Sequence, residues 1–285
     1  MPTSPHPKTI LITGCSTGFG RITALHFAKL GWRVFATVRQ EADRESLLRE
    51  KKEVGEIVPL ICDVTNESQV QELGRGVAAQ TPTLNALVNN AGSAFAAPLE
   101  LLPPDVLRQQ FDLNVIAQLA VTQAVMPLLK ATKGTIINVS SVSGRITSPM
   151  LGPYSASKFA LEALSDALRV ELAPFGVKVV VVEPGSSPTA IWETSLKRAI
   201  AMLAERNIDT SAYTPLVNAM QQVAVERSQA GFPPQLFADT VEKILNSRNP
   251  HARYPIPGNV GWAIRFRRFA PDWLWDWMVR RAMKW

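Results

Sequence analysis

Short apolar runs recur along the first two thirds of the chain, separated by longer stretches with helical periodicity. The runs are residues 8–13, 33–38, 57–61, 86–89, 135–139 and 177–183. Between them, apolar side chains recur every three to four residues over 19–30, 41–52, 67–79, 114–130 and 154–173. Strands of a parallel sheet are apolar on both faces because helices cover both. The alternation therefore predicts an α/β fold, a Rossmann-type doubly wound parallel sheet in a single domain.

A glycine-rich turn follows the first predicted strand, with the sequence TGCSTGFG at residues 13–20. Gly14, Gly18 and Gly20 would let backbone N–H groups approach a phosphate, and the next helix would add its positive N-terminus. The spacing differs from the commonest dinucleotide fingerprint, Gly-x-Gly-x-x-Gly. A dinucleotide site is the prediction, and a glycine-rich turn without a ligand is the alternative.

The end of the second predicted strand bears on which dinucleotide would bind. An acidic residue there would hydrogen-bond the ribose of NAD, whereas an arginine accommodates the 2′-phosphate of NADP. Val38 stands where the acid is expected, and Arg39 follows it. The sequence favours NADP(H) over NAD(H), although Glu41 and Asp43 nearby would repel a phosphate. A solvated surface arginine is the alternative interpretation.

Polar residues also follow the third and fourth predicted strands. Asp63, followed by Val64, could accept a hydrogen bond from an adenine amino group, or it could simply begin the next helix. Residues 89–92 read NNAG, and their small side chains suit close passage of the backbone beside a cofactor. A plain turn is the alternative for this segment.

A tyrosine and a lysine lie four residues apart in the predicted helix that starts near Tyr154. Side chains at i and i+4 share one helix face, so Tyr154 and Lys158 can point into one site. An ammonium beside a phenol favours the phenolate and lowers its pKa, which makes the tyrosine usable as a proton donor and acceptor. Such a pair is a weak signal by itself.

Together these motifs resemble the short-chain dehydrogenase/reductase family, in its shorter single-domain branch, over about residues 8–189. The resemblance implies that Tyr154 protonates a carbonyl oxygen while Ser141 stabilises it by a second hydrogen bond. It also implies that Lys158 lowers the tyrosine pKa and binds the nicotinamide ribose, and that Asn114 supports the lysine. The cofactor residues that it implies are Gly14, Ser16, Thr17, Gly18, Phe19, Gly20, Arg39, Asp63, Val64, Asn90, Ala91, Gly92, Tyr154, Lys158, Pro184, Gly185 and Thr189.

Composition excludes several other functions. Two cysteines among 285 residues form no disulfide framework, and neither they nor the three histidines show metal-ligand spacing, so we expect no metal. No apolar run approaches the length needed to cross a bilayer. Most of the net charge of +6 lies near the C-terminus, and no nucleic-acid recognition module is visible. We expect a cytoplasmic homo-oligomer that binds a small molecule, not nucleic acid, with peripheral membrane contact as an option.

Two later segments would select the substrate. We expect residues 1–257 to form the main domain, with a helical lid over about 186–235 whose apolar residues suit a lipophilic substrate or, alternatively, ordinary core packing. Residues 258–285 would form an amphipathic extension, and five of the seven tryptophans lie there among arginines. This extension could pack on protein or lie at a membrane interface.

The function that follows is an NADP(H)-dependent carbonyl reductase or alcohol dehydrogenase for a steroid, retinoid or other lipid-like substrate. A 3-ketoacyl thioester reductase and a non-catalytic NADPH-sensing protein are the alternatives. The presence of Asn114, Ser141, Tyr154 and Lys158 argues against a sensor, which has no need of a proton donor.

Overall fold

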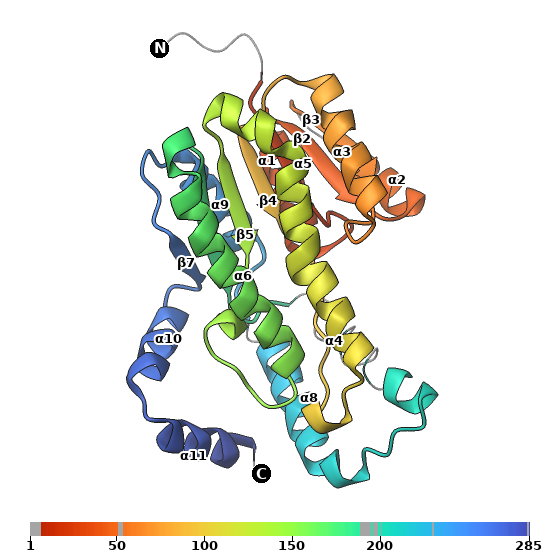
Figure 1. Ribbon diagram of the computed structural model, residues 1–285, viewed down its shortest axis with the longest axis vertical. Coiled ribbons are helices and arrows are strands. Elements are labelled where there is room, and N and C mark those ends of the chain that lie inside the picture. Colours follow the sequence, from red (N-terminus) through yellow and green to blue (C-terminus); the bar gives the residue numbers. More distant parts are fainter. Residues whose placement is uncertain are drawn as a thin grey trace.

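A single parallel sheet organises the molecule (Figure 1). The computed structural model describes residues 7–50, 54–188, 195, 199, 201–229, 231–283 and 285. Within them, seven strands follow the order β3-β2-β1-β4-β5-β6-β7, and every neighbouring pair is parallel. The strands are β1 Thr9–Ile12, β2 Arg33–Val38, β3 Glu56–Ile61, β4 Ala86–Asn89, β5 Thr135–Val139, β6 Lys178–Pro184 and β7 Arg253–Ile256. The strand order reverses between β1 and β4, which is where sheets of this kind bind ligands.

Helices cover both faces of this sheet. Figure 1 shows α3, α5 and α6 in front of it, with α1 and α9 behind. The helices are α1 Gly18–Lys29, α2 Glu41–Glu50, α3 Glu67–Gln80, α4 Pro104–Phe111, α5 Ala117–Thr132, α6 Gly152–Glu171, α8 Thr214–Gln229, α9 Gln235–Asn246, α10 Val260–Phe269 and α11 Asp272–Met283. A π-helical turn, Asp112–Ile116, joins α4 to α5.

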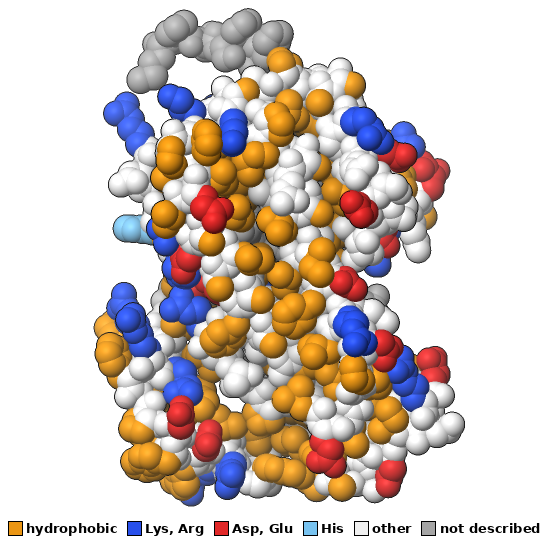
Figure 2. Space-filling model, viewed as in Figure 1, with side chains coloured by type: hydrophobic (Ala, Val, Ile, Leu, Met, Phe, Trp, Pro, Cys, Tyr) orange, Lys and Arg blue, Asp and Glu red, His pale blue; other side chains and the backbone are white. Residues whose placement is uncertain are grey.

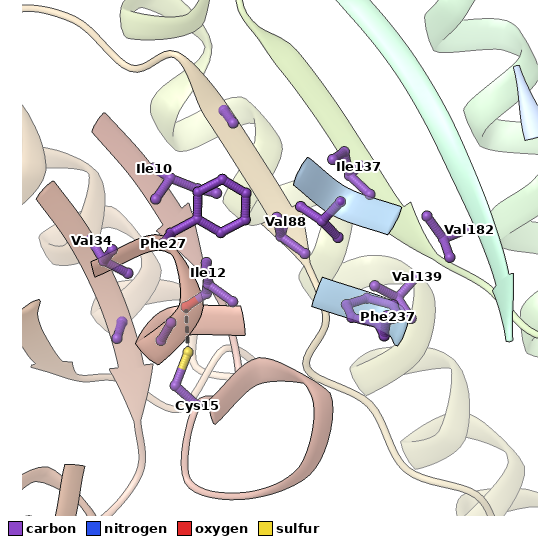
Figure 3. Close-up of a cluster of buried hydrophobic side chains, with 14 of the residues drawn as sticks. Ile10, Ile12, Cys15, Phe27, Val34, Val88, Ile137, Val139, Val182 and Phe237 are labelled. Carbon is purple, nitrogen blue, oxygen red and sulfur yellow. Dashed lines mark hydrogen bonds between the residues drawn. The ribbon is translucent and has the colours of Figure 1, made fainter. Parts of the chain in front are cut away.

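The two hydrophobic cores follow the alternation of side chains along each strand. Ile10 and Ile12 of β1 pack with Phe27 and Phe237 on one face of the sheet (Figure 3). Leu11, between them in sequence, packs into the core on the opposite face. Successive strand residues point to opposite faces, and both faces are covered, so an uninterrupted apolar run is what this position requires.

The sequence-based elements agree with the structure to within one or two residues for the first six strands. One predicted helix differs from the structure, and one strand of the structure was not predicted. The helix expected over 114–130 begins earlier, because α4 and the π-helical turn precede α5 without a break. Strand β7 was not predicted, since its four residues, Arg253–Ile256, are too few to show a period and include Pro255.

The continuous helical stretch Pro104–Thr132 has the length and composition that would let a helix cross a membrane. No segment of this kind was expected from the sequence. Length and composition alone are weak evidence, since core helices of soluble proteins meet the same test. Val121, Val125 and Leu129 of this stretch are buried in the hydrophobic core that also contains Leu11 of β1. We therefore treat this stretch as a core helix.

Candidate functional site

A cavity of about 370 Å³ opens at the carboxyl ends of the strands, around the point where the strand order reverses. Its size falls within the range of small-molecule sites, roughly 300–1,000 Å³. Most of the residues expected to bind a cofactor or substrate line it. These are Gly14, Ser16, Thr17, Gly18, Phe19, Arg39, Asp63, Val64, Asn90, Ala91, Gly92, Ser141, Tyr154, Lys158, Pro184 and Gly185.

Three expected site residues are not part of that lining. Thr189 lies outside the residues that the structure describes. Gly20 is buried in α1, where a methyl group would collide with the carbonyl oxygen of Gly14 and lie 2.5 Å from Asn90 Nδ2. Its role is thus close packing behind the turn rather than direct contact. Asn114 is fully buried behind the cavity wall.

The glycine-rich turn is held tightly against the end of β4. Gly14 has φ +71°, and a methyl group there would lie 2.9 Å from the Cα atom of Ala91. Asn90 Nδ2 donates hydrogen bonds to the carbonyl oxygens of Thr13 at 2.8 Å and Gly14 at 3.1 Å. The conformation and the space both require glycine, so the turn keeps a bare backbone beside the cavity.

The N-terminus of α1 faces the same cavity. Gly18, with φ +60°, begins the helix, and the Thr17 side chain makes no capping hydrogen bond. Uncapped N–H groups at a helix N-terminus attract anions through their dipoles. The bare turn, the helix end and the cavity together fit the phosphates of a dinucleotide.

Arg39 and Asp63 lie on neighbouring parts of the rim. Burial opposes the ionisation of Asp63, but hydrogen bonds from Thr65 Oγ1 at 2.7 Å and Thr65 N at 3.0 Å, together with positive Arg39, outweigh it and lower the pKa of this carboxyl. Both Thr65 bonds go to Oδ1 of Asp63. Arg39 is exposed and lines the cavity at the end of β2.

Helix α6 carries Tyr154 and Lys158 on one buried face. Lys158 Nζ donates a 2.8 Å hydrogen bond to the carbonyl oxygen of Val139 and lies 5.8 Å from the centre of the Tyr154 ring. Burial lowers the pKa of Lys158 to about 8, although the negative charge of Glu162 partly opposes this. The ammonium is therefore easier to deprotonate than an ordinary lysine.

The pKa of Tyr154 differs from the sequence-based expectation. Burial raises it, and a hydrogen bond with Ser141 only partly opposes the rise. The expected lowering by Lys158 does not prevail, because desolvation disfavours the phenolate and the ammonium is directed to the Val139 carbonyl. The pKa of Tyr154 is therefore shifted away from the phenolate.

Ser141 connects the end of β5 to the end of β6. Its Oγ accepts a 3.0 Å hydrogen bond from the N–H of Ser143 and donates a 3.4 Å bond to the carbonyl oxygen of Pro184. The side chain thereby caps the short helical turn Val142–Gly144 and faces the cavity beside Tyr154. These bonds fix the position of the hydroxyl.

Asn114 supports the site from the π-helical turn. Its Nδ2 donates to Ser93 O and to Ser157 Oγ, each at 3.0 Å, and its Oδ1 accepts from Ser93 N at 3.1 Å. A methyl group at Gly92 would lie 3.1 Å from Asn114 Oδ1 and 3.7 Å from Lys158 Nζ. The asparagine and the lysine therefore flank the same backbone segment.

The structure also adds lining residues that sequence reasoning missed. They include Ser93, Leu113, Ser140, Ser187 and Ser195. Serines and leucines are common and these follow no spacing rule, so only their position relative to β4, β5 and β6 identifies them. Ser195 is buried and comes from the segment after β6, which therefore reaches the cavity.

The base of the predicted lid is closed by hydrogen bonds between its two ends. Ser187 Oγ donates to the carbonyl oxygen of Phe232 at 2.8 Å, and Phe232 N donates to Ser186 O at 3.1 Å. Phe19 of the glycine-rich turn stacks on Phe232 at 5.7 Å between ring centres. Both ends of the predicted lid therefore lie beside the glycine-rich turn.

Comparisons with known proteins agree with this geometry. The sequence model of the family described as short chain dehydrogenase matches residues 8–199. The chain is 32% identical to the 3-ketodihydrosphingosine reductase of Bacteroides thetaiotaomicron over 98% of this chain and 97% of that protein. It is 34% identical to the NADPH-dependent 3-dehydrocapnine reductase of Ornithobacterium rhinotracheale, over 86% and 87% of the respective chains.

A solved structure has the same fold. A short-chain dehydrogenase from Streptomyces avermitilis superposes with a TM-score of 0.78 and 27% sequence identity. The match covers 93% of each chain. The similarity therefore extends over nearly the whole of both chains.

Proposed function

Because this chain belongs to the short-chain dehydrogenase family, and is an oxidoreductase with a nicotinamide cofactor, we propose that it interconverts a lipophilic ketone and its secondary alcohol using NADP(H). The observation that carries the proposal is the position of Tyr154. Its phenol lines the cavity, bonds to Ser141 and lies on the same helix face as Lys158. A neutral phenol in that position can give its proton to a carbonyl oxygen.

The residues around the cavity fit the cofactor. The bare turn at Gly14, the uncapped start of α1 and the close-packed Asn90–Gly92 segment suit a dinucleotide backbone. Arg39 lines the cavity at the position where a 2′-phosphate would be recognised, and Val38 leaves no carboxylate to hold a ribose hydroxyl. This arrangement supports NADP(H) over NAD(H).

Each side chain has a distinct part in the proposed reaction. The bound nicotinamide supplies or accepts the hydride at the carbon atom of the substrate. Tyr154 donates its phenolic proton to the carbonyl oxygen, and the Ser141 hydroxyl, rotating away from its 3.4 Å bond to the Pro184 carbonyl, donates a second hydrogen bond to the same oxygen. Lys158, as an ammonium, stabilises the phenolate that remains. Asn114 holds the Ser93 and Ser157 positions around them.

Support for a lipophilic substrate comes from the lid and from the relatives. Leu216 of α8 and Met150 are buried together, with Val217 and Met220 packed against them, so the described part of the lid has an apolar interior, although none of these four residues lines the cavity. The two curated relatives are named as reductases of 3-ketodihydrosphingosine and 3-dehydrocapnine, and the second name specifies NADPH. A ketone borne on a lipid is the substrate class that we propose.

The decisive experiment is NADPH oxidation, followed by absorbance, with steroid, retinoid, sphingoid and ketoacyl thioester carbonyl compounds. Tyr154→Phe should lose turnover by about a thousandfold while NADPH binding, followed by fluorescence, stays within about twofold. Tyr254→Phe is the matched control, because its hydroxyl accepts a hydrogen bond from His251 N at 3.1 Å and Tyr254 does not line the cavity. Full turnover in Tyr154→Phe would overturn the mechanism. NADPH binding without reduction of any carbonyl compound would favour the alternative of a non-catalytic NADPH-sensing protein.

A further inference from the structure

The C-terminal helices carry an aromatic surface that the body of the protein leaves open. Trp262, Phe266 and Phe269 of α10 lie at i, i+4 and i+7, which places them in one stripe along the helix. Their side chains are 70%, 47% and 81% exposed. Single exposed apolar residues are ordinary, but a contiguous stripe of large rings is not.

Helix α11 also carries exposed rings. Trp273 and Trp277, one turn apart, are 72% and 56% exposed. The opposite side of α11 is packed, because Met283 and Val279 join the cluster around Leu216 of α8. Only one side of the helix is therefore accounted for by contacts within the chain. We call the exposed residues of both helices, Trp262, Phe266, Phe269, Trp273 and Trp277, the aromatic face.

Arginines surround the aromatic face. Arg265, Arg268, Arg280 and Arg281 are exposed, and no acidic side chain in the described part of the chain pairs with them. Arg265 and Arg281 lie over the rings of Trp262 and Trp277, at 5.3 and 5.7 Å from their centres. Figure 2 shows blue arginines interspersed with orange hydrophobic side chains over this end of the molecule.

A fifth arginine lies at the junction of the two helices. Arg267 bonds Asp272 at 2.7 Å and the carbonyl oxygen of Ala270 at 3.2 Å, and it also covers the ring of Trp275. Among the five arginines of α10 and α11, Arg267 is the one that is partly buried. These contacts join the end of α10 to the start of α11.

We propose that the aromatic face docks on an anionic phospholipid bilayer. Tryptophan and phenylalanine insert at the boundary between headgroups and acyl chains, and arginines beside them attract anionic lipids. Charge complementarity is the argument for this occupant. Five arginines against Asp272 and Asp276 give α10 and α11 a net charge of +3 (5 − 2), and Arg267 already neutralises Asp272.

The position of this surface relates docking to the site. Val260, at the start of α10, lies beside Gly185 of the cavity lining, where a methyl group would meet its Cγ1 atom at 3.3 Å. At the other end, Trp285 stacks on Tyr213 at 5.9 Å, just before α8. The docked helices would therefore bridge the cavity wall and the lid at the membrane surface. The inference goes beyond the proposed function and does not depend on it.

Vesicle binding tests the inference without any assay of turnover. Co-sedimentation would compare phosphatidylcholine vesicles with and without phosphatidylglycerol. We expect binding that needs the anionic lipid and weakens as salt is raised. Quenching of tryptophan fluorescence by brominated lipids should accompany it, because five of the seven tryptophans lie in this segment. No binding to the anionic vesicles, or no quenching, would overturn the proposal.

Matched variants locate the surface. Phe269→Ser should weaken vesicle binding about tenfold, whereas Phe175→Ser, which removes a ring 49% exposed elsewhere, should leave it unchanged. Arg265→Gln with Arg268→Gln should weaken binding to anionic vesicles, unlike Arg49→Gln with Arg75→Gln, which removes the same charge. NADPH binding checks the fold of each variant. Equal losses of vesicle binding in the target and control variants would overturn the proposal.

A subunit contact is the competing occupant of the aromatic face. Sedimentation velocity of the Phe269→Ser variant without lipid distinguishes the two. An unchanged molecular mass supports a membrane surface. A fall in mass relative to the unmodified protein would assign the aromatic face to a second copy of the chain and overturn the proposal.

Discussion

Asn114 Nδ2 donates a hydrogen bond to Ser157 Oγ across 3.0 Å, and this bond joins the π-helical turn to the helix that carries Tyr154. Ser157 Oγ in turn donates to the carbonyl oxygen of Tyr154 at 2.7 Å. Asn114 and Ser157 are both fully buried. Because π-helical turns replace one regular helical bond and often occur at functional sites, the irregular turn here places an amide where it can brace the helix that carries Tyr154.

Asn114→Ala should destabilise the protein and reduce turnover together. The substitution removes three hydrogen bonds and leaves buried groups of Ser93 without their partner, at a cost of about 2–4 kcal/mol. Ser157→Ala removes fewer bonds and should cost about 1 kcal/mol. Urea unfolding and carbonyl reduction would be measured for both. An Asn114 variant as stable as the Ser157 variant would contradict this role.

The stability of the protein should rise with pH between about 8 and 10.5 because of Lys158. Its pKa is about 8 in the folded protein and 10.5 ordinarily. In that window the unfolded chain holds a proton that the folded chain has released, so the free energy of unfolding increases with pH. Below pH 8 both states are protonated, and the cost of burying the charge is constant.

Lys158→Met should remove that rise. Urea unfolding at pH 7.5 and 10.5 should show the unmodified protein gaining about 3 kcal/mol relative to this variant. Lys29→Met, at an exposed position, is the control and should follow the unmodified protein. Parallel curves for all three proteins would contradict the buried charge at Lys158.

The pH profile of carbonyl reduction should be limited by the same lysine on its alkaline side. Burial raises the pKa of Tyr154, which favours the protonated phenol that donates to the carbonyl oxygen. Lys158 loses its proton near pH 8, so kcat/KM should decline above that value. A profile flat to pH 10 would show that the ammonium is not required in the free enzyme.

Gly20→Ala should impair the dinucleotide end of the site. The added methyl group would collide with Gly14 O and press on Asn90, which costs about 1–3 kcal/mol and displaces the turn. We expect NADPH binding to weaken at least tenfold, measured by fluorescence titration. Gly76→Ala is the matched control, since nothing lies within 4 Å of its methyl group in α3, and it should stabilise by about 0.5–1 kcal/mol. Equal binding in both variants would refute the packing argument.

Arg39→Asp should change cofactor preference. A carboxylate there repels a 2′-phosphate and can accept a bond from a ribose hydroxyl, so NADPH binding should weaken about a hundredfold while NADH binding is retained. Arg49→Asp makes the same charge reversal on α2 at a residue that does not line the cavity. Equal losses of NADPH and NADH binding in the Arg39 variant would show that Arg39 does not recognise the 2′-phosphate.

Much of the fold follows from the sequence because the pattern is local and strong. β2, β4 and β5 lie at the residues predicted for them, since each is an uninterrupted apolar run between polar turns. The glycine-rich turn and the Tyr154–Lys158 pair could be placed in one cavity for the same reason. Parallel strands end at one edge of the sheet, so residues that follow them meet there.

Other features depend on contacts between distant residues. The pKa directions of Tyr154 and Lys158 depend on burial, which a spacing of four residues cannot reveal. The partners of Asn114 lie 21 and 43 residues away in sequence. The sequence by itself determined the order of strands and helices and the residues at their ends, because local periodicity encodes them. Only the tertiary structure decided which groups lost water, which paired, and which rings of α10 and α11 stayed exposed, because those outcomes depend on what packs against each side chain.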